Sequence, residues 1–361
     1  MFGVLYARSL CLLLYGILIG TRYVSYGLKT LYRRHWQMST ASLAYTRKAR
    51  MYIHKCRHIA GLHLTVSLLF LLLLCGDIHS NPGPVLPGSK RHPNLQFLTV
   101  AAWNVRTLVE SKRTPIRPTA IVARELDRYG IDIAALGETR ILGENVIEEC
   151  GGGYTFFLKG KPLGDKHHHG VGFAMRTRLV KHLNGKFPLG INERLMTMSF
   201  PLDGSNLSII SAYAPTLPQS DEIKDSFYDL LSDAVGQVPS SHKLLVMGDF
   251  NARVGSDHTS WESIIGRHGV GNENSNGTRL LSLCAQNELC ITNTFFQQAT
   301  RHKTTWMHPG SKQWHMIDYI ITRRRDIKEV FHTRAMCGST VWSDHRLVRS
   351  KLAFGYNSTT A

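Results

Sequence analysis

Residues 243–251 read KLLVMGDFN, an apolar run that ends in two polar side chains. An apolar run of this length, bounded by a glycine and polar residues, predicts a short buried strand. Asp249 and Asn251 are two residues apart, so on a strand their side chains face the same side. The stretch therefore predicts a core strand that carries an acid and an amide together at its end.

Further segments of the same kind lie on both sides of this stretch. One predicted helix begins with Pro118 and stops at Gly130. A proline at the first position and a glycine just after the last one are common signals of helix boundaries. Strands outnumber helices and alternate with them irregularly, which predicts an α/β fold, a two-layer β-sandwich flanked by helices. The other predicted strands are 98–105, 131–139, 169–175, 195–202, 207–215, 290–296 and 316–322, and the predicted helices are 118–129, 221–238 and 277–289.

Polar residues follow many of these strands, at positions where a hydrophobic core does not need them. An Asp or Asn there usually caps or turns the chain, but an acid inside an apolar strand, such as Asp318, is costly to bury unpaired. Carboxylate oxygens suit a hard ion such as Mg²⁺, and an Asp–His pair can serve acid–base chemistry. The set predicts metal-assisted hydrolysis; it comprises Asn104, Glu138, Tyr213, Asp249, Asn251, Asp318, Asp344 and His345.

Short motifs containing these residues occur in a fixed order. Over roughly 96–354 the series resembles that of the endonuclease/exonuclease/phosphatase superfamily, in particular the endonuclease of non-LTR (LINE-type) retrotransposons. The stretches VARELDRYGIDIAALGETR and KTTWMHPGSKQWHMIDYIITRRRD also resemble craniofacial development protein 2-like sequences, which derive from that class. The motifs are WN (103–104), GET (137–139), YAP (213–215), GDFN (248–251), TTW (304–306), IDYI (317–320) and SDH (343–345).

The resemblance implies two packed β-sheets with the site at one edge of the sandwich, and hydrolysis of DNA phosphodiester bonds with Mg²⁺, or alternatively Mn²⁺. It makes Glu138 the principal metal ligand, with Asn104 beside it and Asp344 near the metal.

The resemblance also assigns the groups that act on the phosphate. It implies that Asp249 activates or orients the attacking water with support from Asn251, while His345, oriented and polarised by Asp318, contacts the scissile phosphate. The further phosphate contacts or supporting positions that it implies are Tyr213, Thr305, Ser343 and Thr216.

Some positions depart from the superfamily pattern or stay open. Thr216 stands where many relatives have Asn, and Arg106 stands where abasic-site enzymes carry an acid, which weakens an abasic-repair function. The run His167–His169 predicts structural or loop histidines, because consecutive residues on a strand point to alternate faces. The run Arg323–Arg325 is either a solvated face or a contact to DNA phosphates.

The charge of the 361-residue chain is +17, which favours polyanionic partners, either nucleic acid or an anionic membrane surface. The first 83 residues hold ten basic residues and one acid, and the apolar stretches 9–20 and 58–76 are borderline for a membrane span. A signal peptide, a signal anchor, a membrane hairpin and an amphipathic segment that never inserts all stay open, so residues 1–76 are the candidate for membrane contact.

Seven cysteines without a C-x-x-C pair argue against a disulfide framework or structural zinc.

A Leu-rich run that ends in DIHSNPGP at 77–84 closes this basic segment. It resembles the 2A-like ribosome-skipping peptides, in which no peptide bond forms between the glycine and the last proline, although His79 stands where that family usually has Glu. The alternative is a turn-rich linker. The predicted organisation is a leader (1–83), a linker (84–95), a catalytic domain (96–354) and a tail (355–361).

The sequence leaves three functions open. The first is a Mg²⁺-dependent DNA endonuclease derived from a retrotransposon, which we expect in the nucleus. The second is a phosphatase of the same superfamily that acts on a phospholipid or inositol phosphate, and the third is a non-catalytic DNA-binding relic. The intact motif residues argue against decay.

Translation of the full chain in a eukaryotic extract is predicted to give two products, one ending at Gly83 and one starting at Pro84, beside some full-length chain. His79→Glu should raise the split fraction because it restores the family residue, and Pro84→Ala should leave only full-length chain because the attacking amine is no longer a proline. A single full-length band from both the wild type and Pro84→Ala would identify 77–84 as a linker.

Overall fold

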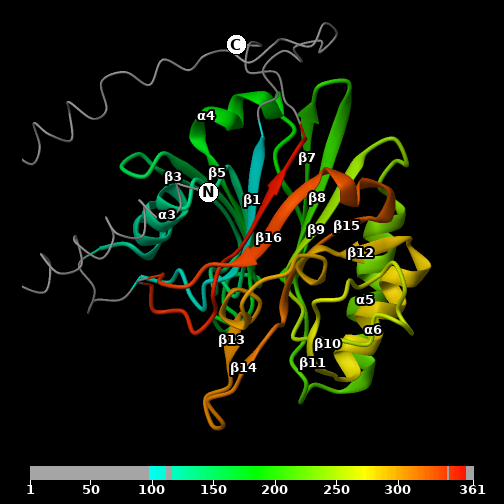
Figure 1. Cartoon of the computed structure of the whole chain (residues 1–361). Helices are drawn as coiled ribbons and strands as arrows, with labels where there is room; N and C mark the ends of the chain where they lie inside the picture. Colours follow the sequence, from blue (N-terminus) through cyan, green and yellow to red (C-terminus); the bar gives the residue numbers. More distant parts are fainter. Residues whose placement is uncertain (1–96, 111–115, 340, 355–361) are drawn as a thin grey trace, which may run out of the picture. The chain divides into compact units, whose positions relative to one another are not determined.

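The computed structural model of the chain describes residues 97–110, 116–339 and 341–354 (Figure 1). The predicted leader, the 2A-like stretch, the linker and the tail lie outside these residues. Among the described residues, no helix is long and apolar enough to cross a membrane.

Two β-sheets form the centre of the described part (Figure 1). The first has seven strands in the order β16–β17–β1–β2–β5–β4–β3, and the second has six in the order β12–β15–β9–β8–β7–β6. Two hairpin-like pairs, β10–β11 and β13–β14, complete the strands. The strands are β1 (Leu98–Asn104), β2 (Ile133–Gly137), β3 (Glu144–Glu149), β4 (Tyr154–Lys159), β5 (Val171–Arg176), β6 (Leu189–Asn192), β7 (Leu195–Leu202), β8 (Ser205–Tyr213), β9 (Lys243–Asp249), β10 (Val254–Gly255), β11 (Val270–Glu273), β12 (Leu289–Ile291), β13 (Trp306–Met307), β14 (Trp314–His315), β15 (Asp318–Arg323), β16 (Val330–Ala335) and β17 (Val348–Leu352).

Helices cover the outer faces of both sheets, so that three apolar layers form. Side chains such as Phe173 and Phe200 fill the layer between the sheets. Leu126 of α3 packs on the outer face of the first sheet, and Leu231 of α5 and Leu280 of α6 pack on the second. This arrangement confirms the predicted two-layer sandwich flanked by helices. The α-helices are α3 (Pro118–Arg128), α4 (Thr177–Val180), α5 (Asp221–Gly236) and α6 (Ser275–Gln286).

Several element boundaries differ from the prediction by a few residues, and at two of them the structure shows the local reason. Helix α6 begins at Ser275, before the predicted start at 277, because the Asn274 side chain caps it by accepting a 2.8 Å hydrogen bond from Gly277 N–H. The strand predicted over 290–296 is shorter, since β12 ends at Ile291 and a 3₁₀ turn follows over Thr292–Thr294.

Strand direction brings the predicted site residues to one edge of the sandwich. Strands β1 and β2 are parallel in the first sheet, and β8 and β9 are parallel in the second, so the carboxyl ends of each pair lie side by side. Gly248, just before the end of β9, has φ 153°, and a Cβ there would lie 1.8 Å from the Ala212 carbonyl oxygen of β8. Only glycine allows the backbone to approach β8 so closely immediately before Asp249.

Gly248→Ala should therefore destabilise the protein by roughly 3 kcal/mol, because the added methyl meets backbone in an unfavourable conformation. The matched control is Gly236→Ala at the end of α5, where a Cβ would meet no atom within 4 Å; its effect should stay within about 1 kcal/mol. Urea unfolding followed by circular dichroism measures both values. Equal effects of the two substitutions would contradict this account of Gly248.

Candidate active site

The site lies where the strand ends of the two sheets meet. Asn104 is the last residue of β1, and Glu138 follows the end of β2. In the second sheet Tyr213 and Asp249, the last residues of β8 and β9, are register partners. Strand β15 runs antiparallel to β9, and its first residue, Asp318, is the register partner of Asp249 on that side. The sheet registers thus place residues far apart in the sequence at one edge.

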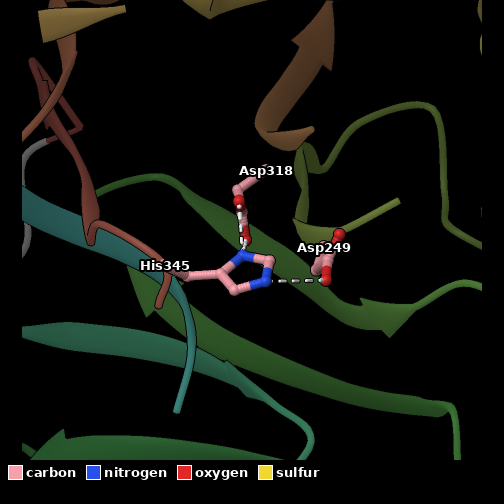
Figure 2. Close-up of side chains that lie close together, drawn as sticks. All are labelled: Asp249, Asp318 and His345. Atoms are coloured by element: carbon pink, nitrogen blue, oxygen red, sulfur yellow. Dashed lines mark hydrogen bonds and ion pairs between the residues drawn. The ribbon is translucent and has the colours of Figure 1, made fainter. Parts of the chain in front are cut away.

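A histidine between two buried carboxylates forms the centre of this edge (Figure 2). His345 Nδ1 lies 3.0 Å from Asp318 Oδ2 and 3.2 Å from Oδ1, and its Nε2 lies 3.9 Å from Asp249 Oδ2. A carboxylate can only accept hydrogen bonds, so the imidazole donates its Nδ1 proton to Asp318. Its other nitrogen is thereby directed toward Asp249.

Burial and mutual charge shift the ionisation of these groups. Burial raises the pKa of Asp249 well above its usual range, and the neighbouring Asp318 carboxylate raises it further against the opposing effect of His345. Burial alone would lower the pKa of His345, but the Asp318 and Asp249 carboxylates outweigh it and raise that pKa. The pair can therefore hold a proton between Asp249 and His345 near neutral pH, which suits acid–base chemistry.

Asn104 connects the two sheets through its side-chain amide. Its Nδ2 donates to Glu138 Oε2 at 3.1 Å and to Asp249 Oδ2 at 2.9 Å, while its Oδ1 accepts from the Arg106 N–H at 2.8 Å. The Glu138 side chain is 18% exposed, whereas that of Asp249 is 1% exposed. Glu138 is thus the carboxylate of this pair that solvent and ligands can reach.

The donor set fits a hard cation. Glu138 supplies an accessible carboxylate, and the Asp249 carboxylate lies on the other side of the Asn104 amide; carboxylate oxygens are ligands that divalent ions such as Mg²⁺ prefer. Among the described residues, Asp249, Asp318 and His345 also bring potential ligand atoms within 4.8 Å of one another. The Asp318 side chain is fully buried and bonded to His345, whereas that of Glu138 is 18% exposed, so Glu138 is the better candidate ligand.

Two hydroxyl groups hold the backbone beside the site residues in place. Thr305 Oγ1 accepts from the backbone N–H groups of Ile317 and Asp318 at 3.1 and 3.2 Å. Ser343 Oγ donates to the Asn104 carbonyl at 2.6 Å and accepts from His345 N–H at 3.0 Å. The geometry gives both hydroxyls a supporting position in the site, since each is engaged with the backbone beside a site residue.

Of the remaining predicted residues, two are held close to Asp249 and two are exposed. Asn251 donates its backbone N–H to Asp249 Oδ1 at 2.9 Å and its side chain to the Ala214 carbonyl at 3.0 Å. Tyr213 is buried, and burial raises the pKa of its hydroxyl, which stays neutral. Asp344 is exposed and accepts a 3.1 Å hydrogen bond from Trp306 Nε1, and Thr216 is also exposed.

Sequence patterns missed two residues that position the site. Asn276 is fully buried in the first turn of α6 and donates to the carbonyls of Pro215 and Asn251 at 2.9 and 3.2 Å. The only sequence signal was an Asn-Gly pair, which is typical of a turn. Arg194, between β6 and β7, donates to the Tyr213 carbonyl at 3.1 Å and contacts His169 Nε2 at 3.2 Å.

The two basic runs have structural contacts. His167 Nδ1 lies 2.8 Å from the Arg140 carbonyl and His169 contacts Arg194, which agrees with the interpretation of loop histidines. Arg323 and Arg325 donate to carbonyls of the segment that follows α5, and Arg324 donates to Ala285 O. Arg323 ends β15 and the other two arginines follow it, whereas Asp318 begins that strand, so the arginines lie away from the site.

The sequence profile of the endonuclease/exonuclease/phosphatase family matches residues 101–345, which include every site residue described above. The chain belongs to this family. Members of this family generally use divalent metal ions, which agrees with the donor set around Glu138.

Individual relatives agree with this membership. Craniofacial development protein 2 of Bos taurus is 31% identical over 252 residues, which are 70% of this chain and 40% of that protein. The chain thus spans less than half the length of this curated relative. Among solved structures, the catalytic domain of APE2 from Xenopus laevis has a TM-score of 0.51 at 16% identity and covers 73% of this chain and 94% of its own. The AP endonuclease LMAP from Leishmania major has a TM-score of 0.50 at 14% identity, with coverage of 71% and 87%. These likenesses show the family fold.

Asn276→Asp should destabilise the protein more than Asn276→Ala. Loss of two buried hydrogen bonds should cost about 2 kcal/mol in the alanine variant. The aspartate should cost about 3 kcal/mol or more, because a buried acceptor-only group would face two carbonyl oxygens. Urea unfolding measures both, and an aspartate variant at least as stable as the alanine variant would show that these two bonds do not hold the loops.

Proposed function

We propose that this member of the family is a divalent-metal-dependent endonuclease that hydrolyses phosphodiester bonds of DNA. The observation that carries the proposal is the buried Asp318–His345–Asp249 group, connected through the Asn104 amide to the accessible Glu138 carboxylate. This group supports the proposal because an acid–base pair beside a candidate cation ligand is what in-line attack of water on phosphorus requires.

Each group has a role that follows from its contacts. Asp249, fixed by Asn104 and by the Asn251 N–H, orients the attacking water and accepts its proton. His345, held protonated by Asp318, donates toward the phosphate oxygens and stabilises their developing negative charge. Tyr213 keeps its proton and can donate a hydrogen bond to the phosphate or the leaving side.

A bound metal ion would add positive charge at the phosphate. Glu138 would hold it, with Asn104 beside that ligand and Asp344 nearby, and the ion, Mg²⁺ or alternatively Mn²⁺, would polarise the phosphoryl oxygens. The Asn104 amide oxygen accepts from the Arg106 N–H, so the partly exposed Glu138 carboxylate, rather than Asn104, is the group that an ion would meet first.

Charge favours DNA as the substrate. The chain carries a net charge of +17, of which the first 83 residues hold +9 and the remainder +8, and such a balance attracts polyanions also in the part that follows the leader. The named solved relatives include an AP endonuclease, and the motif series resembles that of retrotransposon endonucleases. We therefore propose a retrotransposon-derived nuclease that acts in the nucleus once it is separate from the basic leader.

Nicking of supercoiled plasmid by the purified protein tests this proposal. Activity should require Mg²⁺ or Mn²⁺ and disappear in EDTA. Asp249→Ala, Glu138→Ala and His345→Ala should each reduce the rate by at least about 100-fold without unfolding the protein, because each removes transition-state stabilisation. The matched control Asp229→Ala, at an exposed position on α5, should retain the wild-type rate.

Other outcomes would select the alternatives. Near wild-type nicking by metal-reconstituted Asp249→Ala would show that the assignment of Asp249 is wrong. Hydrolysis of inositol phosphates or phospholipid headgroups with intact DNA would indicate a phosphatase. Binding of DNA without any nicking in Mg²⁺ or Mn²⁺ would indicate a non-catalytic DNA-binding relic.

A further inference from the structure

The accessible carboxylate of the site is fully engaged by protein donors. Glu138 Oε1 accepts from Arg140 Nε at 3.1 Å and forms a second, short contact with Arg140 Nη2, while Oε2 accepts from Asn104 Nδ2 at 3.1 Å. Arg140 thus neutralises the charge of Glu138. A cation that approaches Oε1 meets a guanidinium already bound there.

The backbone turn that creates this pairing is strained and firmly held. Glu138 has φ 54° and Arg140 has φ 58°, both in the left-handed region. Thr139 N–H donates to Gly170 O at 3.0 Å and Arg140 N–H donates to His169 O at 2.7 Å. His167 Nδ1 adds a 2.8 Å contact to the Arg140 carbonyl. Such conformations persist only where the surroundings over-determine them, so the turn stays fixed when side chains move.

The guanidinium itself is free to move. The Arg140 side chain is 39% exposed, whereas Glu138 is 18% exposed and is also held by Asn104. A divalent cation on Glu138 and a guanidinium on the same oxygen repel each other strongly at this separation. Between the two partners of Glu138, Arg140 is therefore the one that leaves when a metal ion binds.

We propose that Arg140 is a displaceable counter-ion that exchanges the Glu138 carboxylate for a DNA phosphate when the metal binds. The inference rests on the proposed nuclease function and concerns the regulation of that same site. Without metal, Arg140 satisfies Glu138 and is withheld from DNA. With metal, the planar guanidinium becomes available to a phosphate, which it can contact through two parallel hydrogen bonds.

The exchange has a thermodynamic consequence. Metal binding releases a phosphate-binding group, so metal should strengthen DNA binding, and by linkage DNA should strengthen metal binding to the same degree. Removal of Arg140 should separate the two events. Metal should then bind more tightly to the free protein, because it no longer competes with an internal cation, but it should no longer promote DNA binding through this residue.

Two binding measurements on the full chain test the proposal without any activity readout. Mn²⁺ binding to the DNA-free protein is followed by electron paramagnetic resonance of the free ion. Binding to a fluorescent DNA duplex is followed by anisotropy in EDTA and in Ca²⁺, and a denaturing gel verifies that the duplex stays intact. The variants are Arg140→Gln and Arg140→Lys, with Arg178→Gln as the matched control.

Arg178 also contacts a carboxylate, with Nη2 at 3.5 Å from Asp132 Oδ1, and its side chain is 68% exposed. It follows the end of β5, which runs antiparallel to β2, so it lies at the opposite end of the sheet from Glu138. Its substitution removes the same charge without touching the site.

Arg140→Gln should bind Mn²⁺ about 5-fold more tightly or better, and the increase in DNA affinity on adding Ca²⁺ should fall from about 5-fold or more in the wild type to under about 2-fold. Arg140→Lys, which keeps the charge without the planar fork, should retain wild-type Mn²⁺ affinity and part of the increase. Arg178→Gln should match the wild type in both measurements.

Unchanged or weaker Mn²⁺ binding by Arg140→Gln would overturn the inference, because Arg140 would then not compete with the metal. The same conclusion would follow if metal increased the DNA affinity of Arg140→Gln as much as that of the wild type. Should Arg140→Gln fail to fold, Arg140→Lys decides, and the loss of its Mn²⁺ binding would overturn the inference. A wild-type protein that binds neither Mn²⁺ nor DNA would instead refute the proposed function itself.

Discussion

The side-chain amide of Asn104 joins the two sheets at the point where the site forms. It donates to Glu138 from the first sheet and to Asp249 from the second, so one neutral group keeps two carboxylates at a fixed separation. Without a donor between them, two acids at a partly buried sheet edge would repel each other. The register of β1 with β2 and of β8 with β9 brings the three residues within reach of each other.

Burial of charge at this edge is balanced pairwise. Asp318 is fully buried and is compensated by His345, and Glu138 is compensated by Arg140. Removal of one partner from such a pair leaves a buried charge uncompensated, which is more costly than the pair is stabilising. The arrangement therefore contributes specific geometry more than stability. Backbone donors to Asp249 and Thr305, together with the Ser343 hydroxyl, fix the positions of the charged groups.

Strained backbone concentrates around the same edge. Arg106, Glu138, Arg140, His169 and Asn251 all have positive φ although none is glycine. Each lies in a loop that follows or precedes a strand end of the site. Arg140 N–H donates to the His169 carbonyl, and the Asn251 side chain donates to the Ala214 carbonyl, so hydrogen bonds join several of these loops. The strands that lead into these turns are almost fully buried, so packing of the two sheets holds the strained backbone in place.

The sequence by itself determined the fold class, the strands that enter the site and the motif residues at their ends. The run LLVMG within β9 is apolar throughout because this strand is covered on both faces, and such a strand can be recognised without knowledge of its neighbours. The edge strand β3, ENVIEE, was missed because half of its residues are glutamates, which give little strand signal. Local patterns also gave no sign of Asn276 or Arg194, whose partners lie in other loops. The family resemblance already paired Asp318 with His345, but only the tertiary structure decided that Asn104 spans two carboxylates and that Arg140 occupies Glu138. Those contacts depend on strand register and on loop packing between segments distant in the sequence. The pattern of one short stretch cannot show which distant residues it will contact.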